Sequence, residues 1–136
     1  MATSLVSERL HKFEKLFIDI ETFGSPPNNA LDILTNNIRL VSVATSADDV
    51  VVFDVQRPGV WDVVAQLLED ATLVGHNLAF DLPCLIRRGM PFPIRVRDTM
   101  IASQVICAGY PDWKHNLAAC AQRYLKREIV KDQGAS

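Results

Sequence analysis

The chain has 136 residues, of which 49% are hydrophobic and 22% are charged, and its formal net charge at pH 7 is −2. This length and composition predict one small domain over residues 1–136 with a buried core, and they exclude a disordered chain. The slight negative net charge excludes a general electrostatic attraction to nucleic acid, so such a polyanion would have to be bound at a local site.

The first elements expected along the chain are strands. Residues 15–21, which include Leu16, Phe17, Ile18 and Ile20, indicate a buried strand. A loop rich in proline and asparagine follows at 24–29. Residues 38–45 and 50–55 then predict an antiparallel hairpin, closed by a turn at 46–49.

The second half of the chain predicts helices around one further strand. After Pro58-Gly59, apolar residues recur at helical spacing, and a short buried strand follows before Gly75. Asn77 or His76 opens the next helix, which tolerates Pro83 at an early position. Asp98 is interpreted as the cap of a further helix. These later elements are expected at 60–68 (helix), 71–74 (strand), 76–86 (helix), 99–107 (helix) and 117–125 (helix).

The three cysteines, Cys84, Cys107 and Cys120, are odd in number and lie among apolar neighbours, so we interpret them as buried reduced thiols. Residues 1–15 lack the apolar core of a signal peptide, and no stretch approaches the length of a membrane helix. We therefore expect a soluble cytoplasmic protein with no membrane partner.

Two carboxylates near the end of the first strand form the first chemical signal. Asp19 and Glu21 lie two residues apart, so a strand places both side chains on one face. At a separation of roughly 5 Å and an effective dielectric of 20, their repulsion costs about 3 kcal/mol. A divalent cation would remove that cost. Oxygen ligands without a Cys or His pattern favour Mg²⁺ or Mn²⁺.

A second acidic motif runs from His76 to Asp81 as His-Asn-Leu-Ala-Phe-Asp. Together with Asp19-Ile20-Glu21-Thr22, it resembles the first two motifs of the DEDD superfamily of 3′-5′ exonucleases. The stretches 97–103 and 115–125 are similar to the proofreading domain of family A DNA polymerases and to RNase D. The resemblance covers about residue 15 to the last residue.

The resemblance implies specific roles for these residues. Asp19, Glu21 and Asp81 would hold two Mg²⁺ or Mn²⁺ ions over the scissile phosphate. Other residues of the two motifs would hold the terminal nucleotide or support the second motif beside it. These substrate-binding candidates are Thr22, Phe23, Gly24, Asn77 and Phe80.

The resemblance also implies a fold and an activity. The fold would be an RNase H-like α/β architecture, in which a mixed sheet combines an antiparallel hairpin with a parallel strand and is flanked by helices. The activity would be the hydrolysis of 3′-terminal nucleotides. A single-stranded DNA 3′ end is the favoured substrate because of the likeness to proofreading domains. RNA stays open through RNase D, and a polymerase domain is a candidate partner.

One family motif is missing from the sequence. A Tyr or His four residues before an Asp should follow on a final helix, but none follows Asp81. Tyr124 and Glu128 keep the spacing with a longer acid, in a segment that matches an earlier helix. Because 131–136 resembles the stretch that precedes the missing helix, we expect a C-terminally truncated domain with impaired activity. A non-catalytic fragment that binds nucleic acid or protein, or that self-associates, is the alternative.

Other side chains have a structural interpretation beside the functional one. Arg87, Arg88, Arg95 and Arg97 form a basic cluster, for which an ordinary solvated surface is the simpler interpretation. His76 could act as a general base, but we expect it to be structural.

Overall fold

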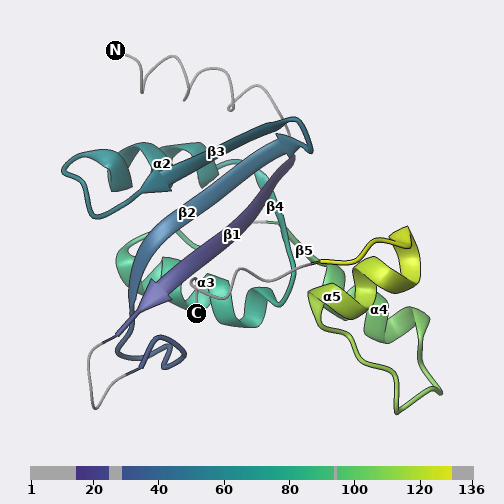
Figure 1. The fold of residues 1–136 in the computed structure, drawn as a ribbon. Coiled ribbons are helices and arrows are strands. Elements are labelled where there is room, and N and C mark those ends of the chain that lie inside the picture. Colours follow the sequence, from purple (N-terminus) through teal and green to yellow (C-terminus); the bar gives the residue numbers. More distant parts are fainter. Residues whose placement is uncertain (1–14, 25–28, 94, 130–136) are drawn as a thin grey trace.

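The computed structural model describes residues 15–24, 29–93 and 95–129. Its centre is a five-stranded sheet with the strand order β3-β2-β1-β4-β5 (Figure 1). The strands are β1 Lys15–Phe23, β2 Asn37–Ser46, β3 Asp49–Asp54, β4 Thr72–Gly75 and β5 Val96–Asp98. Strands β1 to β3 pair antiparallel, whereas β4 is parallel to β1 and β5 is parallel to β4. The predicted combination of a hairpin and a parallel strand is confirmed.

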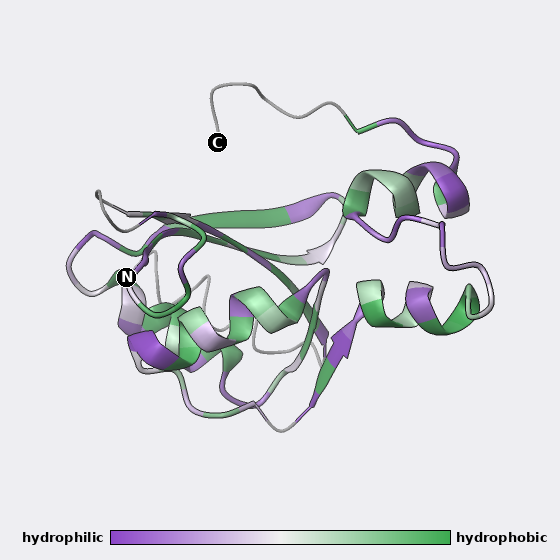
Figure 2. Ribbon diagram, turned by 90° about the horizontal axis from the view of Figure 1, so that it is seen from below, coloured by the Kyte–Doolittle hydropathy of each residue, from purple (hydrophilic) through white to green (hydrophobic). Residues whose placement is uncertain are grey.

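The helices form two groups around this sheet. Two longer helices cover one face of it, and two short ones form a pair beyond the β5 edge (Figures 1 and 2). In the part of the chain that the structure describes, no helix is long and apolar enough to cross a membrane. The helices are α2 Val60–Leu68, α3 Leu78–Arg88, α4 Thr99–Ile106 and α5 Leu117–Cys120, and α5 continues into the π-helix η1 Ala121–Leu125.

Two sequence-based expectations need correction. Strand β5 is not predicted by the sequence, because three residues with two charges give no hydrophobic pattern. These residues form a strand because their backbone pairs with β4. The last helix was expected to be regular over 117–125, but its second half is a π-helix that ends at Lys126 in the left-handed conformation. A π turn accommodates one extra residue, which apolar spacing does not reveal in so short a segment.

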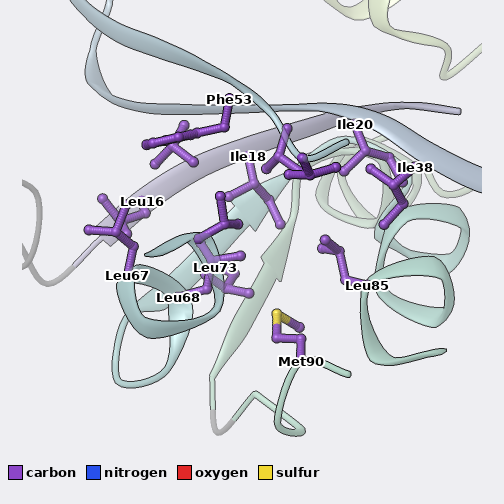
Figure 3. Packing of buried hydrophobic residues seen from close by; sticks show 14 of the residues in the cluster. Leu16, Ile18, Ile20, Ile38, Phe53, Leu67, Leu68, Leu73, Leu85 and Met90 are labelled. Atoms are coloured by element: carbon purple, nitrogen blue, oxygen red, sulfur yellow. The ribbon is translucent and has the colours of Figure 1, made fainter. Parts of the chain in front are cut away.

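The hydrophobic core lies between the sheet and helices α2 and α3 (Figure 3). The alternation of β1 produces its sheet side, because every second side chain from Leu16 to Ile20 is buried. Each such aliphatic side chain contributes roughly 1.5–3 kcal/mol when it leaves water. The opposite face of β1 carries Asp19 and Glu21, as predicted. The core therefore fixes where the two carboxylates point.

Gly75 ends β4 and sets the position of α3. A Cβ atom there would lie 3.2 Å from the carbonyl oxygen of Ile18 and would collide with the Leu78 side chain. The absence of a side chain lets the start of α3 lie against the backbone of β1 beside Asp19. Because β1 pairs with β4 only from Lys15 to Phe17, its acidic end continues past β4 toward this helix.

We expect Gly75→Ala to lower the free energy of unfolding by about 1–3 kcal/mol, the usual cost of overpacking. Urea denaturation would measure the loss. In the Gly75→Ala background, Leu78→Ala should cost less than it costs in the unmodified chain, because it removes the colliding carbon. Additive losses in this double-mutant cycle would contradict the proposed contact.

Candidate active site

Asp19 and Glu21 lie on the face of β1 that points away from the core. Asp19 pairs with Ser42 of β2 and Glu21 with Leu40, and the strand is irregular immediately after Glu21. Although Asp19 is exposed as a residue, loss of water around its carboxyl raises its pKa, and repulsion from Glu21 adds to the shift. The backbone hydrogen bond from Ile20 acts in the opposite direction. This end of β1 is therefore a region of unfavourable negative charge.

Asp81 lies in the first turn of α3 and is almost fully buried, with 5% of its surface exposed. Its Oδ2 atom has no hydrogen-bond partner in the described structure. Burial raises the pKa of Asp81 to about 7, and repulsion from Asp19 and Asp98 contributes. A buried carboxylate oxygen without a donor is costly unless a cation or a proton balances it.

Asp98 organises the backbone around Asp81. Its Oδ1 accepts a hydrogen bond from the Met100 amide at 2.8 Å, which confirms the predicted cap of α4. The same carboxylate also accepts from the amides of Asn77 at 3.0 Å and Leu78 at 2.8 Å. One side chain therefore holds the beginnings of both α3 and α4. No local pattern in the sequence indicates this second role, since it joins residues that are distant in the chain.

Asp98→Ala is expected to destabilise the fold by about 2 kcal/mol, because three backbone amides lose their acceptor and a single cap contributes about 1 kcal/mol. Thermal or urea unfolding would measure the change. Asp48→Ala, in the exposed turn between β2 and β3, is the control and should change stability by less than about 0.5 kcal/mol. Equal losses in the two variants would contradict the double cap.

His76 joins the candidate site to the outer helix pair. Its Nδ1 lies 2.9 Å from Thr99 Oγ1, and its Nε2 lies 2.7 Å from the carbonyl oxygen of His115. A carbonyl only accepts, so Nε2 carries a proton in this contact. Both ring nitrogens have partners, which supports the structural interpretation over that of a general base.

The residues after the first acidic motif shape a loop. Thr22 donates its hydroxyl hydrogen to the carbonyl oxygen of Ala30 at 2.6 Å. A Cβ at Gly24 would lie 2.7 Å from the backbone carbon of Asn29, so this position needs glycine for close packing. Phe23 keeps 39% of its surface exposed. Of the three candidates here, Phe23 is the one with a free apolar surface.

Asn77 and Phe80, the remaining candidates, differ in their surroundings. Asn77 precedes α3 in the left-handed conformation, with φ 65°, and its side chain makes no capping hydrogen bond. Asn77 thus stands at the start of α3, as expected, but the Asp98 side chain accepts the hydrogen bonds from the first amides there. Phe80 is half-buried and packs against the core. Pro83 lies further inside α3 than expected, where it removes one helical hydrogen bond.

Tyr124 and Glu128 do not form a substitute for the missing motif. The Tyr124 hydroxyl lies 3.0 Å from Ser103 Oγ and 3.3 Å from Cys107 Sγ, so it belongs to the packing of η1 on α4. Glu128 is exposed beyond the end of η1. The stretch 131–136, on which the expected truncation depends, lies outside the described residues.

The carboxylates fit a hard cation by their chemistry. Repulsion from Glu21 raises the pKa of Asp19, and repulsion from Asp19 in turn raises the pKa of Asp81, so the three carboxylates lie in one region of negative charge. In the described ranges, however, no three acidic, imidazole or thiol groups stand close enough together to bind one ion. The unpartnered Oδ2 of Asp81 is the observation that favours a cation here, because Mg²⁺ and Mn²⁺ prefer carboxylate oxygens.

A family model described as 3′-5′ exonuclease matches residues 3–136. The chain belongs to this exonuclease family. It is also 34% identical over 134 residues to DNA polymerase I of Aquifex aeolicus (strain VF5). The alignment covers 95% of this chain and 20% of the polymerase. The chain thus corresponds to about a fifth of that relative, and its family is one of exonuclease domains, which are nucleic-acid hydrolases.

Solved structures agree with the family in their fold. NrnC of Brucella melitensis, bound to pGG in one structure and to Mg²⁺ in another, is 23% identical, with TM-scores of 0.70. These matches cover 92% and 93% of this chain and 59% and 60% of NrnC. RNase D of Escherichia coli is 16% identical, with a TM-score of 0.72, over 99% of this chain and 34% of that one. The expected RNase H-like fold is confirmed.

Proposed function

We propose that this exonuclease domain hydrolyses 3′-terminal nucleotides from single-stranded DNA with the help of Mg²⁺ or Mn²⁺. The observation that carries the proposal is the buried, unpartnered Oδ2 of Asp81 beside Asp19. A fold that only packed its core would gain stability from an apolar residue at this position. The family match and the identity to a DNA polymerase support a nucleic-acid substrate.

The side chains would divide the work between the metal and the substrate. Asp19, Glu21 and Asp81 would hold the ions, which supply an activated water and balance the charge on the phosphate. Phe23 would pack its exposed ring against the terminal base. Asn77, whose side chain is exposed, would contact the strand beside it.

The charge balance predicts weak metal binding. The family pattern has four carboxylates, and this sequence provides three in the matching motifs. Three carboxylates leave part of the charge of two divalent ions unbalanced, so at least one ion should bind weakly. We therefore expect activity to need more metal than in relatives with the complete pattern. A polymerase domain is proposed as the natural partner, because the relative is a DNA polymerase.

The test uses 5′-labelled single-stranded DNA, an RNA of the same sequence and a circular DNA without ends. Each substrate is incubated with the purified chain over a series of Mn²⁺ and Mg²⁺ concentrations and with EDTA. We expect a metal-dependent ladder that shortens from the 3′ end of the linear DNA, with the circle intact.

Each other outcome changes the proposal in a defined way. Faster shortening of the RNA would replace DNA by RNA as the substrate class. Cleavage of the circle would contradict exonuclease action. Binding of the linear strand by a folded chain, without shortening at any metal concentration, would overturn catalysis in favour of a binding function.

A further inference from the structure

The basic cluster of the sequence is divided by the fold. Arg87 and Arg88 end α3, whereas Arg95 and Arg97 belong to β5 and the segment before it. The first two line a cavity of about 430 Å³, within the range of roughly 300–1,000 Å³ typical of small-molecule sites. Its walls come from the start of β2, the end of α3 and the segment after β3. They are Asn36, Asn37, Ile38, Gln56, Cys84, Arg87 and Arg88.

Arg87 is held in place before any ligand arrives. Its Nε donates to the carbonyl oxygen of Ile33 at 3.1 Å, and its Nη2 donates to the Oδ1 of Asn36 at 2.8 Å and to the Asn36 carbonyl oxygen. Asn36 is fully buried. No hydrogen bond among the described residues uses Nη1, so its N–H groups remain available to a ligand. The contacts of Nε and Nη2 hold these N–H groups in a fixed orientation.

Arg88 supplies a second cation on the same cavity. Its guanidinium lies over the Trp61 ring, 5.3 Å from the centroid. Within the described part of the chain, neither Arg87 nor Arg88 has a carboxylate at ion-pair distance; the ion pair found there joins Arg57 to Asp54. Two of the four carbonyl groups in the last turn of α3, those of Leu85 and Ile86, accept from the amides of Met90 and Gly89, which reduces the negative potential at this helix end.

The remaining polar walls suit the rest of an organic phosphate. The Gln56 side chain donates from Nε2 to the Ile38 carbonyl oxygen at 3.0 Å, so its Oε1 remains an acceptor for a hydroxyl group. Asn37 adds an exposed amide. Fixed guanidinium donors bind phosphate oxygens, and amides bind sugar hydroxyls.

We propose that this cavity binds the phosphate group of a sugar phosphate, either of a free nucleotide or of a nucleic-acid strand. It is separate from the candidate active site, since Asp19, Glu21 and Asp81 are not among its walls. It nevertheless adjoins the end of β1, because Asn37 pairs with Phe23 and Ile38 with Thr22. Asp32, whose carboxylate feels the charge of Arg87, also lies outside the walls.

The test is an NMR titration of the ¹⁵N-labelled chain in EDTA, which keeps metal-dependent hydrolysis out of the measurement. Ribose 5-phosphate is the probe for a free nucleotide, a short DNA strand is the probe for nucleic acid, and ribose is the uncharged control. The chain has two tryptophans, and both lie under an arginine: Trp61 under Arg88 and Trp113 under Arg123, at 4.8 Å. The variant Trp113→Phe assigns the two indole signals.

We expect ribose 5-phosphate to shift the Trp61 indole signal, with no matching shift for Trp113 or with ribose. Arg88→Gln should weaken binding at least about tenfold, whereas Arg95→Gln, an exposed arginine outside the cavity, should leave it within about twofold. A saturable shift with the strand alone would assign the site to nucleic acid. Equal shifts of both indoles, equal weakening by both variants, or no shift with either phosphate probe would overturn the proposal.

Discussion

Replacing Asp19 by Asn is expected to reduce metal-dependent shortening of a 3′ end by at least about 100-fold. The substitution preserves shape but removes one charge from the carboxylates that would hold the ions, and such electrostatic groups contribute several kcal/mol to catalysis. Single-turnover rates at saturating Mn²⁺ would measure the loss. Because Asp19 also repels Asp81 and Glu21, the variant should be at least as stable as the unmodified chain.

Asp54→Asn is the matched control for this loss. Asp54 pairs with Leu40, which pairs with Glu21, so it lies in the same row across the sheet, two strands from the candidate site. It should retain its rate within about twofold, because its side chain makes a surface ion pair with Arg57 and accepts a hydrogen bond from the Gln56 amide, and neither contact involves the candidate site. Equal rates for Asp19→Asn and the unmodified chain would show that the shortening comes from other groups or from a contaminating nuclease.

The second large effect concerns the pH dependence of stability without metal. The pKa of Asp81 is raised from 3.8 to about 7 in the folded chain. Between these values the folded state holds a proton that the unfolded state has lost, so stability falls as the pH rises from about 4 to 7 and levels off above the folded pKa. The contribution of this residue is at most about 4 kcal/mol. Urea unfolding in EDTA at several pH values would measure it.

Asp81→Asn isolates this contribution. The amide does not ionise, so the stability of the variant should fall much less between about pH 4 and 7. Above about pH 7 the variant should be more stable than the unmodified chain. Above about pH 7, Mn²⁺ should restore the stability of the unmodified chain, because a cation then balances the charge that the proton had balanced. The same Mn²⁺ concentration should raise the stability of the variant by less. Parallel pH profiles of the two proteins would contradict the assignment to Asp81.

The sequence determined β1 and the hairpin well because their signals are local. Alternation along β1 places Leu16, Ile18 and Ile20 in the core and the two carboxylates on the other face, as the structure has them. The turn between β2 and β3 was found within a residue for the same reason. The family motifs placed Asp81 at the beginning of a helix, where it lies.

The features that sequence reasoning missed depend on partners far along the chain. Strand β5 exists through its pairing with β4, and Asp98 caps α3 through amides about twenty residues earlier. Asn36, a polar residue in a loop, is fully buried because Arg87 and the Ala30 carbonyl satisfy it. Apolar periodicity carries no information on such pairs, so only the fold reveals them.

The pairing of β1 has a consequence for the order of folding. Its antiparallel neighbour β2 follows closely in sequence, whereas its parallel neighbour β4 contributes only three residue pairs and requires closure of a long segment of chain. Local contacts form before distant ones, so the three-stranded meander should assemble first and β4 should dock late. Asp19 and Asp81 would then meet only in the final step. Their mutual repulsion would speed unfolding while leaving the folding rate nearly unchanged.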